Sequence, residues 1–165
     1  MDQTLNLEPR RVFDFFQAMC AIPHGSGNTR AVSDYCAGVA REHGLWYRQD
    51  ELGNLLIRRP ADPGCEDRDP VILQAHLDMV WIQSPEAAGQ GIRLVRDGDL
   101  LRAESSTLGA DDGIGVAYVL ALLTQKEGPF PPLEGLLTVD EETSMEGAER
   151  FDCSLLQGRR LINLD

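Results

Sequence analysis

The chain has 165 residues, of which 42% are hydrophobic and 25% charged, a composition typical of one globular unit with a core and not of a fibre or a disordered segment. The 27 acidic and 15 basic residues give a formal net charge of −12. A field of this sign repels phosphate backbones and anionic membrane surfaces, so we expect neither nucleic acid nor a membrane as a partner.

Nothing in the sequence indicates export or membrane insertion. Residues 1–9 are polar and lead into Arg10 and Arg11 without an apolar run, so no signal peptide is predicted. The longest apolar stretch, residues 116–123, is too short to span a bilayer. We therefore expect a cytoplasmic protein. Its four cysteines show no Cys-x-x-Cys pairing and are predicted to be reduced thiols, with Cys36 in the core.

Two helices are predicted at the beginning of the chain. The first begins after Pro9, and its apolar residues recur at helical spacing from Val12 to Met19. The second follows a polar N-cap and ends at Gly44. Between them, a glycine-rich turn carries His24. We expect this turn to be an exposed loop, with a place at the rim of an active site as the alternative.

The rest of the chain alternates short apolar runs with loops and one long helical pattern. A helix is expected over 114–125, and strands are expected over 45–49, 54–58, 71–75, 92–96, 100–103, 133–139 and 161–164. The turn Asp97-Gly98-Asp99 predicts a hairpin. Because buried strands alternate with helices, we predict an α/β fold with a mostly parallel sheet flanked by helices.

Acidic residues and one histidine follow these apolar strands at or just beyond the point where each strand ends. They are His76, Asp78, Glu141, Glu142 and Asp165. Ligands of open α/β sheets gather at this edge, so residues far apart in sequence are expected to converge there. Asp111 is expected to begin a helix, where unpaired N–H groups and the helix dipole stabilise a carboxylate.

A bound metal is the simplest physical explanation for such a cluster. Several carboxylates and one imidazole in a single cleft are stable together only if cations neutralise their charge. Carboxylate and imidazole ligands suit zinc or its divalent neighbours. Asp78 lies two residues beyond His76 and, if the strand continues, would hold the second ring nitrogen of that histidine. Each piece alone is usually structural or solvated, and only the combination is specific.

Four segments together resemble a known family. They are His76-Leu77-Asp78, Gly109-Ala110-Asp111-Asp112-Gly113, Asp140-Glu141-Glu142 with Glu146-Gly147-Ala148, and Ile162-Asn163-Leu164-Asp165. These segments resemble the co-catalytic two-zinc exopeptidases related to carboxypeptidase G and aminoacylase, and the resemblance covers nearly the whole chain. Around residues 107–115 and 161–165 the sequence is most similar to the cytosol non-specific dipeptidases, also called aminoacyl-histidine dipeptidases.

The resemblance implies hydrolysis of dipeptides by a water activated between two divalent metal ions, zinc in the first place, with manganese or cobalt as alternatives. Asp111 resembles the carboxylate that bridges both ions. His76 and Asp165 resemble the other ligands of one ion, and Glu142 a ligand of the second. The partners implied are small peptide substrates.

Two further residues acquire roles from the same resemblance. Glu141 resembles the general base that takes a proton from the attacking water, and Asp78 resembles the aspartate behind the metal-binding histidine. Two positions depart from the subgroup. Asp112 stands where asparagine is frequent, and we expect it to be a helix-start residue and not a ligand. Trp81 stands where a smaller residue is expected, which bears on substrate preference.

The resemblance also has implications for domain organisation. Residues 1–165 would be the N-terminal part of the catalytic domain, without the lid and dimerisation domain, the C-terminal part and a distal histidine ligand. A homodimer through the absent domain is implied for the complete protein. We expect the chain alone to bind metal incompletely, to keep an unpaired sheet edge and to be marginally stable.

Three alternatives remain open at this stage. A related amidohydrolase would remove acyl groups from amino acids with the same motifs. A truncated, inactive remnant would bind metal only in part. A nucleotide-binding module is disfavoured because the run that contains Gly109, Gly113 and Gly115 lacks both the Gly-x-Gly-x-x-Gly order and the lysine of a phosphate loop.

Overall fold

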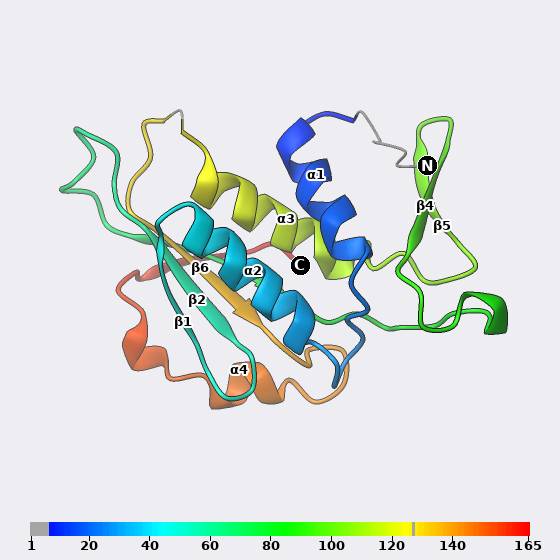
Figure 1. The fold of residues 1–165 in the computed structure, drawn as a ribbon. Helices are drawn as coiled ribbons and strands as arrows, with labels where there is room; N and C mark the ends of the chain where they lie inside the picture. The colour runs from blue at the N-terminus through cyan, green and yellow to red at the C-terminus, as the bar shows by residue number, and fades with distance from the viewer. Residues whose placement is uncertain (1–6, 127) are drawn as a thin grey trace.

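The computed structural model describes residues 7–126 and 128–165 (Figure 1). The prediction that there is no signal peptide rests partly on residues 1–6, which lie outside the described residues. The helices are α1 (Arg10–Cys20), α2 (Arg30–Glu42), α3 (Ala110–Thr124) and α4 (Glu146–Arg150), with short 3₁₀ turns at η1 (Pro85–Ala87) and η2 (Cys153–Leu155). The strands are β1 (Trp46–Gln49), β2 (Leu55–Arg59), β3 (Val71–His76), β4 (Arg93–Asp97), β5 (Leu100–Glu104), β6 (Leu133–Thr138) and β7 (Arg160–Asn163).

Five strands form one mixed sheet in the order β1-β2-β6-β3-β7. Strand β3 runs parallel to both β6 and β7, whereas β2 runs antiparallel to β1 and β6. The predicted α/β fold class is confirmed. The sheet is mixed because only a short turn joins β1 to β2, and a turn of that length allows only antiparallel pairing.

The β4–β5 hairpin predicted from Asp97-Gly98-Asp99 is also confirmed. It forms a separate two-stranded sheet that projects from the body of the molecule (Figure 1). Gly98 has a φ of +62°, a conformation that glycine adopts without steric cost.

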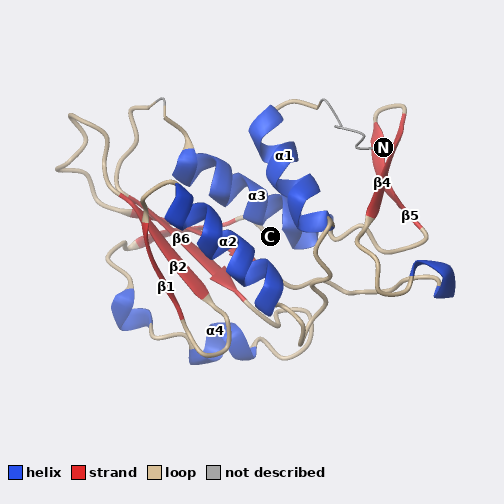
Figure 2. Ribbon diagram, in the orientation of Figure 1, coloured by secondary structure: helices blue, strands red, loops and turns tan. Residues whose placement is uncertain are grey.

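Helices α1, α2 and α3 build the main hydrophobic core with one face of the sheet (Figure 2). Helix α3 packs on β3 and β6, α2 packs on β1 and β2, and α1 packs on α3. Helix α3 lies close to the sheet at Gly135, where a Cβ would lie 2.6 Å from Leu123 Cδ1 and 2.7 Å from Val119 Cγ1. Cys36 is fully buried in this core, as predicted, and all four cysteines are free thiols.

The opposite face of the sheet carries the alternate residues of the same strands. Leu56, Ile72 and Leu136 lie on this face and are buried. Strand β7 forms the edge of the sheet within the described chain, and Leu161 and Ile162 on it are about half exposed. Among the described residues no helix combines the length and the apolar character needed to cross a membrane.

Candidate metal centre

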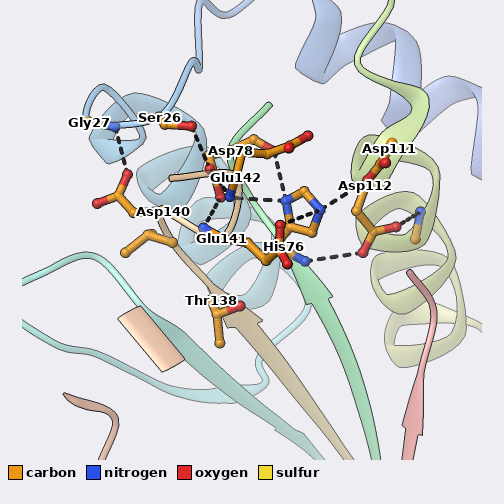
Figure 3. A network of polar contacts seen from close by, with 12 residues as sticks. Ser26, Gly27, His76, Asp78, Asp111, Asp112, Thr138, Asp140, Glu141 and Glu142 are labelled. Carbon is orange, nitrogen blue, oxygen red and sulfur yellow. Dashed lines mark hydrogen bonds and ion pairs between the residues drawn. The ribbon is translucent and has the colours of Figure 1, made fainter. Parts of the chain in front are cut away.

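The predicted site residues meet at one edge of the sheet, beyond the carboxyl ends of β3 and β6 (Figure 3). His76 is the last residue of β3 and lies opposite Thr138, the last residue of β6. The chain then turns after each strand, which brings the segment of Asp78 beside that of Glu141. The structure therefore brings together side chains that are more than 60 residues apart in sequence.

His76 lies at the centre of this cluster. Its Nε2 is 3.0 Å from Oδ1 of Asp111 and 4.0 Å from Oε2 of Glu141. On the other side of the ring, Nδ1 is 2.9 Å from the main-chain oxygen of Asp78 and 3.4 Å from its carboxylate. Burial lowers the pKa of His76, but the hydrogen bonds and negative charge of Asp78 and Asp111 outweigh burial and raise the pKa to about 9.

Asp78 is buried and ties three segments together. One carboxylate oxygen accepts a hydrogen bond from the main-chain N–H of Glu141 at 2.9 Å. The other accepts from the N–H of Glu142 at 3.2 Å and from the hydroxyl of Ser26 at 2.7 Å. Burial raises the pKa of Asp78, but hydrogen bonds from His76, Ser26 and the two N–H groups lower it to about 2. The carboxylate therefore stays ionised and fixes the backbone of both glutamates.

Asp111 and Asp112 lie in an irregular stretch at the beginning of α3. Asp111 lies in the first turn of α3, as expected, but ψ angles of 111° at Asp111 and 30° at Asp112 show that this turn is not regularly helical. Asp112 is buried, and its carboxylate accepts from the N–H of Gly115 at 3.1 Å, which is the contact of a helix-start residue. Its second oxygen accepts from the N–H of His76 at 3.1 Å. Asp111, by contrast, is exposed and turned toward the His76 ring.

The donor set fits a divalent metal. Ligand atoms of His76, Asp111 and Glu142 all lie within 4.8 Å of one another, and so do those of His76, Glu141 and Asp165. Two ligands of one tetrahedral zinc ion lie about 3.4 Å apart. The 3.0 Å between Nε2 of His76 and Oδ1 of Asp111 is close to that spacing. Imidazole nitrogen and carboxylate oxygen are ligands that zinc and its neighbours accept.

The cluster is strongly acidic. Within the described chain, the ion pairs of Asp78, Asp111 and Glu141 are all made with His76 and none with Arg or Lys. Burial and the nearby charge of Asp111 raise the pKa of Glu142. Cations held among these carboxylates would offset this repulsion.

The loop between α1 and α2 contributes contacts that the sequence reasoning missed. Besides the Ser26 hydroxyl, the N–H of Gly27 binds the carboxylate of Asp140 at 2.6 Å (Figure 3). The expectation that His24 lies in an exposed loop is wrong, because its ring is buried and packs edge-on against Trp81. The Cβ and ring of Trp81 cover Gly25, where a Cβ would lie 2.5 Å from Trp81 Cβ.

The mixed sheet flanked by helices is a fold that the chain shares with solved peptidase structures. No protein-family model matches the chain. The cytosol non-specific dipeptidase of Escherichia coli (strain K12) is 41% identical over 169 residues, covering 100% of this chain and 35% of that protein.

Solved structures agree with this relationship. Aminoacylhistidine dipeptidase from Vibrio alginolyticus matches with a TM-score of 0.92 and 39% identity, over 98% of this chain and 34% of that one. Aminopeptidase PepT from Bacillus cereus has the same fold, with a TM-score of 0.80 and 22% identity over 96% of this chain and 44% of that one. The chain is similar to the E. coli and V. alginolyticus dipeptidases, and it spans about a third of the length of each.

Proposed function

We propose that the full-length protein is a cytoplasmic, metal-dependent dipeptidase that hydrolyses small peptides at the cluster around His76. The observation that carries this proposal is that ligand atoms of His76, Asp111 and Glu142 lie within 4.8 Å of one another, and so do those of His76, Glu141 and Asp165. The similarity supports the substrate class, because the E. coli and V. alginolyticus relatives, 41% and 39% identical, are named dipeptidases. The name of the E. coli relative, a cytosol dipeptidase, supports the location.

The proposed ligands are His76, Asp111, Glu142 and Asp165. Asp111 is the best placed to bridge two ions because it is exposed, approaches His76 Nε2 and lies in a ligand group with Glu142. Two zinc ions, or manganese or cobalt in their place, would supply positive charge that polarises the scissile carbonyl and acidifies a water. His76 offers Nε2 to this side of the site because its Nδ1 lies against Asp78.

Glu141 is the proposed general base. Its side chain is about one third exposed, so water and substrate reach it, and Oε2 lies 4.0 Å from His76 Nε2. The carboxylate takes a proton from the attacking water and delivers it to the nitrogen of the leaving amine. Asp78 holds the N–H groups of Glu141 and Glu142. Because adjacent side chains leave the backbone in different directions, the two glutamates can divide the roles of base and ligand.

Metal content and substrate choice test the proposal. In the full-length protein, Asp111→Ala is expected to lose both equivalents of metal after dialysis, because one carboxylate is shared, whereas His76→Ala weakens mainly one. Unchanged stoichiometry in Asp111→Ala would rule out the bridging role. A panel of free dipeptides and N-acyl amino acids separates the dipeptidase from an amidohydrolase. Turnover of the acyl amino acids alone would overturn the proposed substrate class.

A further inference from the structure

We propose that Asn54 is a positioning residue that closes the segment carrying Glu141 and Glu142. That segment, residues 139–147, is called the acidic loop below. The inference rests on the proposed function, because the positions of the two glutamates affect activity only if Glu141 is the general base and Glu142 a metal ligand. Asn54 lies outside the metal centre, directly before β2, and is 1% exposed.

One carboxamide binds both ends of the acidic loop. The Oδ1 of Asn54 accepts a hydrogen bond from the main-chain N–H of Val139 at 3.1 Å, where the loop leaves β6. Its Nδ2 donates to the main-chain oxygen of Gly147 at 2.9 Å, where the loop enters α4. The side chain of Asn54 therefore holds the two ends of the loop together, and we call this closure the neck.

The orientation of the Asn54 amide is fixed by Asp50. Nδ2 also donates to Oδ2 of Asp50 at 2.7 Å, and an ionised carboxylate only accepts hydrogen bonds. Oδ1 of Asp50 in turn accepts from the main-chain N–H groups of Gly53 and Asn54, both at 2.9 Å. Both amide hydrogens and the oxygen of Asn54 thus have partners, which makes the neck a fully satisfied buried network.

The ends of the loop are also in direct contact at Gly147. A Cβ at this position would lie 2.3 Å from the main-chain oxygen of Val139 and 2.7 Å from both the Val139 nitrogen and Asn54 Oδ1. Backbone atoms at this distance cannot move aside as a flexible side chain would. Only glycine therefore fits the neck, and a larger residue forces the loop ends apart.

The loop needs such an external clamp because parts of its own backbone are unfavourable. Asp140 and Met145 have φ values of 58° and 55°, a left-handed conformation that non-glycine residues keep only where surrounding contacts hold them. Beyond the neck, Asp78 and Gly27 bind the first half of the loop. Opening the neck releases the second half of the loop and also the N–H of Val139, two residues before Glu141, so that the contacts with Asp78 and Gly27 alone hold the two glutamates. Their carboxylates then shift, and a misplacement of about 1 Å at a reacting group costs about 10²-fold in rate.

Two variants open the neck from opposite sides in the full-length protein. Asn54→Asp keeps the acceptor for Val139 but sets a carboxylate oxygen against Gly147 and Asp50, which are both acceptors. Gly147→Ala pushes the loop ends apart without altering Asn54. The matched controls are Ser33→Ala, which removes a 2.6 Å hydrogen bond to Gly53 in the same turn, and Gly38→Ala, where a Cβ meets nothing within 4 Å.

Hydrogen exchange of the metal-free protein gives a readout that is independent of catalysis. In both neck variants we expect the amides of residues 140–146 to exchange about 10-fold faster than in wild type, while exchange in α2 is unchanged. In both controls we expect the amides of residues 140–146 to exchange at about the wild-type rate. The zinc-loaded enzymes are then expected to show kcat lowered about 10²-fold in the neck variants, with KM changed less than about threefold. Normal exchange of residues 140–146 in a folded neck variant, or a kcat no lower than in the controls, overturns the proposal.

The same experiment separates this inference from the proposed function. If wild-type protein neither binds two metals nor hydrolyses dipeptides, the proposed function fails, and the exchange data alone decide whether Asn54 closes the loop. If wild type is active and the neck variants behave as the controls do, the positioning role of Asn54 fails while the dipeptidase assignment stands.

Discussion

Asp78 accepts hydrogen bonds from the segment that carries Glu141 and Glu142, and the variant Asp78→Asn measures how much these bonds contribute to the free energy of unfolding. Each carboxylate oxygen accepts a main-chain N–H, one from Glu141 and one from Glu142. An asparagine amide has a single oxygen, so in either orientation one of these N–H groups faces an NH₂ group. Leaving such a donor without its partner costs about 1–3 kcal/mol, and the lost bond was to an ion, which is the stronger kind. We expect the free energy of unfolding to fall by this amount.

The assay is urea unfolding of the full-length protein, with Asp140→Asn as the control. Asp140 lies in the same acidic loop and carries the same charge. Among the described residues its side chain accepts only the hydrogen bond from the Gly27 N–H, and an amide oxygen can keep that bond. The control therefore corrects for the relief of charge repulsion. If the two variants unfold within about 0.5 kcal/mol of each other, the reasoning about Asp78 is refuted, since unrelated surface substitutions differ by no more.

Two further predictions concern the core and the thiols. Gly135→Ala places a methyl group 2.6 Å from Leu123 Cδ1. This overpacking should lower the free energy of unfolding by about 1–3 kcal/mol in the same urea assay. An unchanged unfolding midpoint would show that α3 moves aside freely. A brief thiol-labelling pulse on native protein, read by peptide mass spectrometry, should modify exposed Cys153 and spare Cys20 and Cys36, because burial raises the pKa of both buried thiols to about 12. Labelling of Cys36 before Cys153 would contradict the packing of α2.

Elements with a strong local pattern could be predicted from sequence, and their arrangement could not. The apolar spacing from Val12 to Met19 and the turn at Gly98 correctly predicted α1 and the β4–β5 hairpin. The insertion of β6 between β2 and β3 depends on pairings such as Leu55 with Leu137 and Leu73 with Gly135, which no local pattern encodes. Helix α4 is only five residues long and has no apolar periodicity to reveal it.

The same distinction applies to the site. The positions of His76, Glu141 and Asp165 at strand ends were sufficient to predict that they converge. The burial of His24 was missed because Gly25 and Gly27, which follow it, indicated a loop, whereas the packing of Trp81 is a tertiary contact. Asn54 was missed for a similar reason. Its sequence position indicates only a turn residue, and its hydrogen bonds to Val139 and Gly147 form only in the folded chain.

The central claim is that Glu141 is the base and its neighbour Glu142 a ligand, and one variant tests it directly. Glu141→Gln keeps the shape of the side chain but cannot take up the proton. In the full-length protein it is expected to retain both metals and to lose about 10²- to 10⁴-fold in kcat on dipeptides. A near wild-type rate would show that the base lies elsewhere. Loss of one metal equivalent would show that Glu141 is itself a ligand. It would then share an ion with His76 and Asp165, whose ligand atoms lie within 4.8 Å of its own.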